Sequence, residues 1–273
     1  MTTADDPGFA ALARKISQGA GLPVGAYKDK CVRRRIAVRM RACGVHTYAD
    51  YQRLLDHSPA EYERLRDALT INVTRFYRNA ETWNLLRRDL IPHLCAPGPG
   101  EIRIWSAGCS SGEEAYTLAI LAVEHLERDG RSGELGRLVV DATDVDRLSL
   151  ERAQAARYRP ENLAEMPAEL RDRYLEPAGD EVQVAARVRA RVSVRRLDLS
   201  AGHPLRRDYH MIVCRNVLIY FDRPVQERLF QMFSDSLAPG GYLVLGKVET
   251  LFGTARDRLV IVDPRERVYR RPA

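Results

Sequence analysis

The stretch Glu101-Ile-Arg-Ile-Trp-Ser-Ala-Gly-Cys-Ser-Ser-Gly-Glu-Glu114 decides the fold of this 273-residue chain. It opens with a short apolar run typical of a buried strand and continues into small residues, after which residues 113–127 carry helical periodicity. Gly108 and Gly112 form a G-x-x-x-G pattern, which is neither the G-x-G-x-x-G dinucleotide fingerprint nor a P-loop. The stretch therefore predicts a strand, a glycine-rich turn and a helix.

Strands and helices alternate downstream of this stretch. Further strands are expected at 138–144, 209–216 and 241–246, and helices at 149–156 and 226–237. This alternation predicts an α/β fold with a parallel sheet covered by helices on both faces. Three short period-two runs break the alternation and predict a small antiparallel β insert: 173–176, 181–184 and 188–194.

The N-terminal part reads differently, because residues 9–70 show helical spacing and no strand-like alternation. Its most basic helix is expected at 28–41, where an apolar seam recurs at every fourth position: Val32, Ile36 and Met40. Three arginines lie off this seam and are expected to remain available to a partner: Arg35, Arg39 and Arg41. A small all-α domain therefore precedes the α/β domain.

Composition narrows the class of protein. The net charge of +6 and the pI of about 9.2 favour an acidic partner, either nucleic acid, an anionic membrane or an acidic protein surface. The five scattered cysteines argue against a disulfide framework and a structural zinc site, and they favour the cytoplasm. Residues 1–8 are polar, unlike a signal peptide, and no apolar run reaches the roughly 20 residues of a membrane helix.

The acids around the glycine-rich turn indicate the ligand. Glu113 and Glu114 stand at the helix start, where a phosphate prefers neutral or positive groups, so a cationic or neutral ligand fits better. Asp144 ends the second strand, where an acid commonly binds ribose hydroxyls. Asp146 is its near competitor, with helix N-capping as the alternative role. An adenosine-type ligand with a sulfonium charge fits this combination.

Three motifs resemble those of the CheR-type chemotaxis protein methyltransferases: Asn72-Val-Thr-Arg-Phe-Tyr-Arg78, Ile104-Trp-Ser-Ala-Gly-Cys-Ser-Ser-Gly-Glu-Glu114 and Cys214-Arg-Asn-Val-Leu-Ile-Tyr-Phe221. The likeness covers nearly the whole chain. It implies a helical receptor-recognition domain at 1–75 and a Rossmann-like S-adenosylmethionine-dependent methyltransferase domain at 76–273. The small β subdomain would span about 173–195.

The residues themselves point to cofactor contacts at Gly108, Glu114 and Asp144. The resemblance implies the further contacts Asn72, Thr74, Arg78, Asp198, Leu199, Arg215 and Asn216. Arg78 is also expected to hold one oxygen of the acceptor carboxylate, and Tyr220 to orient the nucleophile or contact the methyl group. The chain departs from the family at Asp198, where asparagine is common, and at Gly246-Lys-Val-Glu249, where Gly-His-Ser-Glu is common.

The resemblance implies methyl transfer to glutamate side chains in the cytoplasmic methylation region of chemoreceptors, with S-adenosylhomocysteine as the second product. No metal, nucleic acid or membrane insertion is expected, and the chain is expected to act as a monomer. An ionised carboxylate needs no general base, so we expect a shallow pH profile above about pH 6. The turn Pro177–Asp180 looks short, which predicts that no receptor C-terminal tether peptide is required.

Two other functions remain open from the residues. A nucleic-acid methyltransferase would also use a basic helix, although Arg-Asn-Val-Leu-Ile-Tyr at 215–220 stands where nitrogen-methylating enzymes often carry Asp/Asn-Pro-Pro-aromatic. A non-catalytic S-adenosylmethionine-sensing module would need the cofactor site alone. The joint retention of five groups argues instead for an active enzyme: Arg78, Glu114, Asp144, Asn216 and Tyr220.

Overall fold

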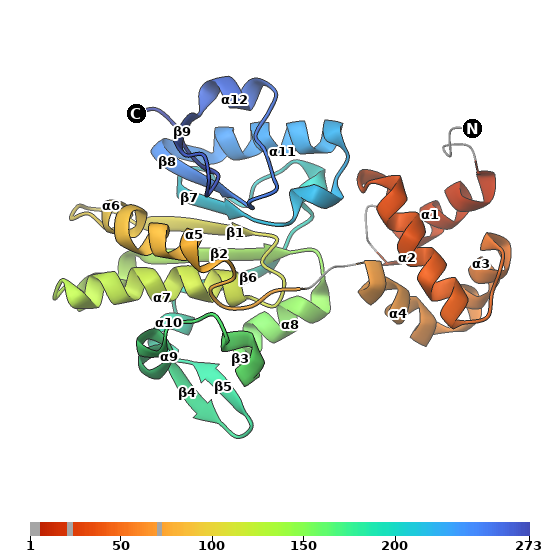
Figure 1. Ribbon diagram of the computed structural model, residues 1–273, viewed down its shortest axis with the longest axis horizontal. Helices are drawn as coiled ribbons and strands as arrows, with labels where there is room; N and C mark the ends of the chain where they lie inside the picture. Colours follow the sequence, from red (N-terminus) through yellow and green to blue (C-terminus); the bar gives the residue numbers. More distant parts are fainter. Residues whose placement is uncertain (1–5, 21–23, 70–72) are drawn as a thin grey trace. The chain divides into compact units, whose positions relative to one another are not determined.

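The computed structural model of the protein describes residues 6–20, 24–69 and 73–273. It contains two compact units, drawn in Figure 1. The helical unit comprises Met1–Ile71 together with Tyr220–Gln226, and the α/β unit comprises Asn72–Ile219 together with Glu227–Ala273. No helix among the described residues is both long and apolar enough to cross a bilayer.

The helical unit is built from short amphipathic helices, as predicted. They are α1 (Pro7–Ala20), the 3-10 turn η1 (Val24–Ala26), α2 (Asp29–Ala42), α3 (Tyr48–His57) and α4 (Pro59–Leu69). The apolar seam of α2 is confirmed, since Val32, Ile36 and Met40 are all buried. Thr47 begins α3 as its N-cap by accepting a hydrogen bond from the Asp50 N–H at 3.1 Å.

The α/β unit is organised around one seven-stranded sheet. Its strands are β1 (Ile102–Ala107), β2 (Leu138–Asp144), β6 (Val192–Arg196), β7 (Tyr209–Cys214), β8 (Leu237–Leu245), β9 (Val260–Asp263) and β10 (Val268–Arg270). Their order is β6-β2-β1-β7-β8-β10-β9. The first five run parallel, and β10 and β9 extend the sheet antiparallel, which confirms the predicted mostly parallel α/β fold.

Helices connect and cover these strands. They are α5 (Ala80–Leu85), the π-helical turn η2 (Leu86–Leu90), α6 (Ile91–Leu94), α7 (Glu113–Arg128), α8 (Arg147–Ala155), α9 (Ala168–Tyr174), α10 (Ala186–Arg189), α11 (Arg223–Ser236) and α12 (Thr254–Arg258). Short 3-10 turns lie at η3 (Ser132–Arg137), η4 (Pro160–Leu163), η5 (Leu199–Ala201) and η6 (Leu218–Tyr220). The central strands β1 and β7 are each buried at five of their six positions, because a parallel sheet buries both of its faces.

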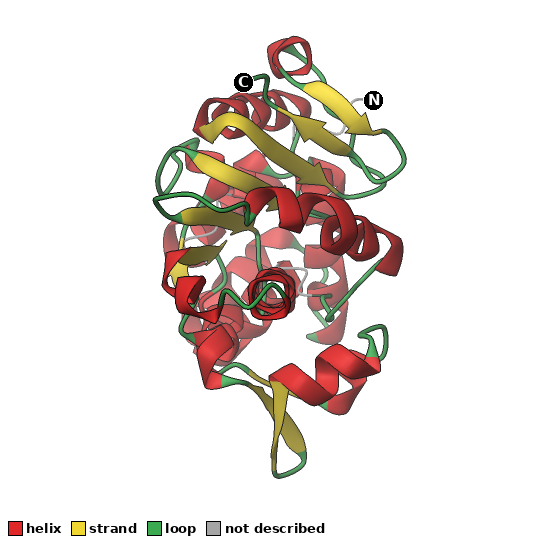
Figure 2. Cartoon of the chain, turned by 90° about the vertical axis from the view of Figure 1, so that its left-hand side faces the viewer, coloured by secondary structure: helices red, strands yellow, loops and turns green. Residues whose placement is uncertain are grey.

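The predicted antiparallel insert exists, but its strands differ from the expected ones. A three-stranded sheet in the order β3-β5-β4 combines β3 (Arg157–Tyr158), β4 (Leu175–Ala178) and β5 (Glu181–Val184), and its hairpin projects from the α/β unit in Figures 1 and 2. Arg173 and Tyr174 belong to α9 instead, where the Tyr174 ring is fully buried and its hydroxyl donates to Glu127 at 2.9 Å.

The prediction that 188–194 belongs to the insert is wrong. Residues Val192–Arg196 form β6, which pairs in parallel with β2 at the edge of the main sheet. Val188 lies in α10 and is fully buried. A period-two pattern reports an extended chain with two unlike faces, but it carries no information about which strand is the partner.

Candidate active site

The carboxyl ends of β1, β2 and β7 lie side by side at one edge of the sheet, because these neighbouring strands run parallel. The glycine-rich turn that follows β1 is attached there by two backbone hydrogen bonds. The N–H groups of Gly108 and Cys109 donate to the Thr143 carbonyl near the end of β2, at 2.8 and 2.9 Å. The sequence elements singled out around Gly108 and Asp144 therefore meet in space.

Both glycines of the turn are required by geometry. Gly108 has φ +84°, and a Cβ there would lie 2.5 Å from a methyl carbon of Val217. Gly112 has φ +96°, and its Cβ would lie 2.9 Å from both Ala153 and the Tyr158 hydroxyl. Residues other than glycine rarely adopt such φ values, and their side chains would not fit in the space. The backbone of this turn therefore stays close to its neighbours.

Asp144 binds the backbone of the glycine-rich turn and of the segment that begins α8. One carboxylate oxygen accepts the Ser110 N–H at 2.8 Å, and the other accepts the Asp146 N–H at 2.9 Å. Burial raises the pKa of Asp144, while these N–H donors oppose that rise. The Val145 N–H also donates to this carboxylate. A carboxylate offers about four acceptor positions, so these three donors leave one for a ribose hydroxyl. Asp146 is the N-cap of α8, the alternative role foreseen for it, and accepts from Leu148 and Ser149.

Glu114 is the acid best suited to a cationic group. Its side chain is 13% exposed, accepts the Ser106 hydroxyl at 2.9 Å and lies 3.7 Å from the Arg215 guanidinium. Burial raises the pKa of Glu114 to about 7, although Arg215 and Ser106 oppose the rise. A cationic ligand at this carboxylate stabilises its ionised form and thereby lowers that pKa.

Arg215 supports the segment that carries Arg78. Its guanidinium is almost fully buried and donates to the Arg78 carbonyl and the Asn79 side-chain oxygen, at 3.0 Å each. It also lies 5.2 Å from the Trp83 ring centroid, and the Trp83 indole N–H donates to the same Arg78 carbonyl at 2.9 Å. The structure thus gives Arg215 a structural role. Its contact with the cofactor stays a prediction.

Several residues near the site adopt left-handed backbone conformations. Tyr77, Asn79, Ser110 and Asn216 have φ of 60°, 65°, 50° and 60°. Such conformations cost on the order of 1–3 kcal/mol outside glycine, and they are enriched at functional sites. They lie in the Arg78 segment, the glycine-rich turn and the turn after β7, which are the three segments that the sequence motifs singled out.

For the other residues predicted to contact the cofactor, the structure gives the local surroundings only. Asp198 caps η5 by accepting the Ser200 N–H at 2.9 Å, and the adjacent Leu199 is buried. The Leu197 N–H donates to the Asp144 carbonyl at 2.9 Å, so this segment runs beside Asp144. Thr74 is half-buried. Asn72 lies outside the described residues.

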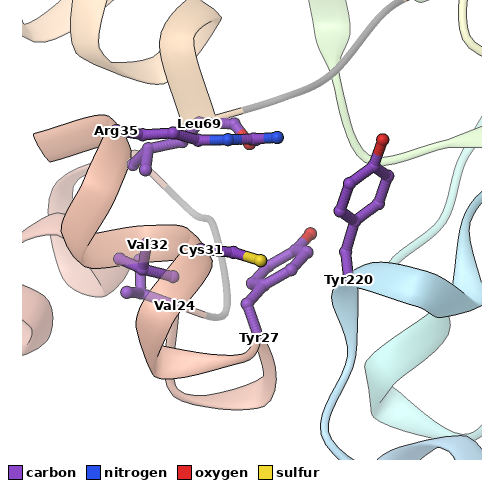
Figure 3. A pocket seen from close by; sticks show the side chains of 7 residues that line it. All are labelled: Val24, Tyr27, Cys31, Val32, Arg35, Leu69 and Tyr220. Atoms are coloured by element: carbon purple, nitrogen blue, oxygen red, sulfur yellow. The ribbon is translucent and has the colours of Figure 1, made fainter. Parts of the chain in front are cut away.

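Tyr220 opens the segment Tyr220–Gln226, which packs within the helical unit. Its carbonyl accepts the Lys28 N–H at 2.8 Å, and the Arg35 guanidinium lies 5.4 Å from its ring centroid. Figure 3 shows Arg35 extending from α2 towards Tyr220 beside a small, mostly apolar pocket. The pocket is lined by Val24, Tyr27, Cys31, Val32, Arg35, Leu69 and Tyr220.

The three arginines expected to face a partner differ in their surroundings. Arg41 is exposed, whereas Arg35 is half-buried and burial lowers its pKa. The expectation that Arg39 remains available is wrong. Arg39 forms a bidentate ion pair with the buried Glu61, which also accepts a hydrogen bond from the Tyr51 hydroxyl at 2.7 Å. Its position off the apolar seam placed it against α4 instead of solvent.

The sequence analysis missed one carboxylate near the carboxyl ends of β7 and β8. Glu249 is buried and accepts hydrogen bonds from the backbone of the turn after β7. The sequence drew attention to the segment Gly246–Glu249 only as a departure from a family motif. Among the described residues, no group of three or more His, Cys, Asp or Glu side chains is arranged to hold a metal ion.

The residues at the sheet edge fit an adenosine-type ligand with a positive charge. Asp144 can meet ribose hydroxyls, Glu114 can meet a cation, and the glycine-rich turn is hydrogen-bonded beside both of them. The fold and the site thus define a nucleoside-binding enzyme domain of the Rossmann-like class.

Comparison with known proteins specifies the family. Residues 72–267 match the "CheR methyltransferase, SAM binding domain", and residues 7–70 match the "CheR methyltransferase, all-alpha domain". A chemotaxis protein methyltransferase of Klebsiella aerogenes is 35% identical over 92% of this chain and 86% of its own length. Chemotaxis protein methyltransferase 2 of Pseudomonas aeruginosa is 32% identical over 88% of this chain and 85% of its own. The chain belongs to the CheR methyltransferase family and is an S-adenosylmethionine-dependent methyltransferase.

Proposed function

We propose that the protein transfers the methyl group of S-adenosylmethionine to glutamate side chains in the cytoplasmic methylation region of chemoreceptors, and thereby serves sensory adaptation. The products are glutamate methyl esters and S-adenosylhomocysteine. The observation that carries the proposal is the match of both parts of the chain to one family, at 7–70 and 72–267, combined with a site suited to a cationic nucleoside. We further propose cytoplasmic location and action as a monomer.

The division of labour follows the predicted domains. Residues 1–75 would recognise the receptor, and residues 76–273 would carry the methyltransferase site. The exposed face of α2 supports the recognition role, because Arg34, Val38 and Arg41 lie on it at helical spacing. A basic face of this kind complements an acidic helical bundle.

The cofactor would be held at the edge of the parallel sheet. Glu114 would bind the amino group and Asp144 the ribose hydroxyls, and Gly108 would contact the cofactor from the glycine-rich turn. The other proposed contacts are Asn72, Thr74, Arg78, Asp198, Leu199, Arg215 and Asn216. When bound, S-adenosylmethionine supplies an electrophilic methyl carbon and a leaving group that departs uncharged.

The protein groups then need to orient reactants more than to move protons. A glutamate acceptor is ionised at neutral pH, so one of its oxygens can bond to the methyl carbon as the carbon–sulfur bond breaks, and no proton moves. Arg78 would hold the other oxygen through a charge-assisted hydrogen bond. Tyr220 would orient the nucleophile or contact the methyl group. Alignment and exclusion of water supply the rate enhancement.

The β4–β5 hairpin bears on how the receptor is engaged. Only Gly179 and Asp180 separate the two strands, and Gly179 has φ +70°. This short turn supports the proposal that the enzyme does not depend on a receptor C-terminal tether peptide. Addition of such a peptide to a methylation assay should leave the rate unchanged.

A labelling experiment tests the proposed reaction. The protein is incubated with methyl-labelled S-adenosylmethionine and a receptor cytoplasmic fragment, and the product is then treated with mild base. Release of the label as volatile methanol is expected, because carboxyl esters hydrolyse under these conditions. Base-stable label on the fragment, or transfer to RNA instead, would contradict the proposed substrate. Cofactor binding without any transfer would favour the sensing module.

A further inference from the structure

The carboxylate of Glu249 joins the ends of two neighbouring strands in the α/β unit. Glu249 follows β8 and is 4% exposed. One of its oxygens accepts the N–H groups of Gly246 at 2.7 Å and Asn216 at 3.0 Å, and the other accepts the Ile219 N–H at 3.3 Å. A single side chain therefore binds its own turn and the turn that follows β7.

The packing around this carboxylate leaves no space for a side chain at Gly246. A Cβ on Gly246 would lie 2.8 Å from a Glu249 carboxylate oxygen and 2.9 Å from the Asn216 nitrogen. Glycine is therefore needed at 246 because the carboxylate and the Asn216 backbone meet there. Gly246, the Glu249 carboxylate and the Asn216 backbone are therefore closely packed against one another.

The turn held by Glu249 contacts the cofactor region. Asn216, which adopts φ 60°, is one of the proposed cofactor contacts. The next residue, Val217, packs directly on Gly108, since a Cβ on Gly108 would lie 2.5 Å from it. The chain of contacts thus runs from Glu249 through the turn 216–219 to the glycine-rich turn after β1.

We propose that Glu249 is a positioning residue for the cofactor site, which holds the turn 216–219 so that Asn216 and Val217 are correctly placed beside the glycine-rich turn. This inference rests on the proposed cofactor site. It requires an acceptor-only group, because all of its backbone partners are N–H donors: Gly246, Asn216, Leu218 and Ile219. An amide at this position would direct its own N–H groups at backbone N–H groups.

Calorimetric titration of S-adenosylhomocysteine into the full-length protein tests the inference. Glu249→Gln is nearly isosteric and should raise the Kd at least about tenfold, while the number of sites per chain stays near one. Glu266→Gln is the control, because Glu266 is also a poorly exposed carboxylate, at 12%, but its partners are the Thr82 hydroxyl and the Lys247 ammonium in place of backbone N–H groups. Its Kd should remain within about twofold of that of the wild type.

The outcomes separate positioning from mere stabilisation. If Glu249→Gln lowers the number of sites but leaves the Kd unchanged, the residue only stabilises the fold and the inference is wrong. Glu249→Asp keeps an acceptor-only group with a shorter reach, so its Kd should lie between those of the wild type and Glu249→Gln. A Kd for Glu249→Asp above that of Glu249→Gln would contradict the acceptor argument. Wild-type protein that binds no S-adenosylhomocysteine would overturn the proposed cofactor site itself.

Discussion

Arg39 and Glu61 form a bidentate ion pair within the helical unit, with Nε 3.0 Å from Oε1 and Nη2 2.5 Å from Oε2. Glu61 is 3% exposed, and α2 and α4 are joined through this pair. The pKa of Glu61 is lowered, because hydrogen bonds from Arg39 and Tyr51 outweigh the opposing effect of burial. The pair therefore belongs to the interior of the helical unit.

Removal of Arg39 should destabilise the helical unit. Arg39→Ala leaves the Glu61 carboxylate buried without its cation, which typically costs about 3 kcal/mol. Urea unfolding followed by circular dichroism measures the change. Arg41→Ala is the control on the same helix, and because Arg41 is exposed its free energy of unfolding should change by less than about 0.5 kcal/mol. Equal effects of the two substitutions would contradict the assigned roles.

Charge reversal on the exposed face of α2 should weaken receptor engagement. Arg34→Glu and Arg41→Glu together should lower kcat/KM for a receptor fragment by about tenfold at low salt, because like charges then face an acidic bundle. The difference from wild type should shrink as ionic strength rises. The Kd for S-adenosylhomocysteine should not change. A salt-independent loss, or no loss at low salt, would rule out electrostatic recognition through this face.

Cofactor affinity should depend on pH through Glu114. The pKa of its carboxyl is raised to about 7 by burial, so the group is largely protonated at pH 6 and largely ionised at pH 7.5. A cationic amino group binds the ionised form, so affinity for S-adenosylhomocysteine should rise by roughly an order of magnitude across this interval. The expected shallow pH profile then applies to the chemical step at saturating cofactor only.

The matched variant for this prediction is Glu114→Gln. It should bind S-adenosylhomocysteine weakly at both pH values, because a neutral amide has no proton to lose in this range. Calorimetric titrations at pH 6 and pH 7.5 measure the dependence. A pH dependence that persists in Glu114→Gln would assign it to another group.

Substitution of Gly108 should damage the cofactor site in a way that a second change relieves. Gly108→Ala introduces a Cβ against Val217 and requires φ +84°, so cofactor affinity should fall by at least about tenfold. Val217→Ala removes the clashing methyl groups, and the double variant should recover part of the affinity. The recovery should be incomplete, because the backbone strain remains. A double variant no better than Gly108→Ala would mean that the steric contact is not the cause.

Much of the architecture follows from local sequence patterns. Apolar runs predicted β1, β2 and β7, and the fourfold spacing of Val32, Ile36 and Met40 predicted the buried face of α2. The glycine-rich turn and Glu114 are contiguous with β1, so one stretch of sequence contains both. Local patterns succeed here because they record which face of an element is buried, and burial is a property of each element.

Which strands pair, and which distant side chains meet, was decided only by the tertiary structure. The extended run that became β6 could pair in either sheet, and in the structure it pairs in parallel with β2. Arg39 meets Glu61 from 22 residues away, and Glu249 meets Asn216 from 33 residues away. Spacing along the chain says nothing about such encounters, because hydrogen bonds and ion pairs form between groups that topology brings within about 3 Å. The sequence determined the elements and the chemical groups, and the fold determined which of those groups serve the site and which hold it in shape.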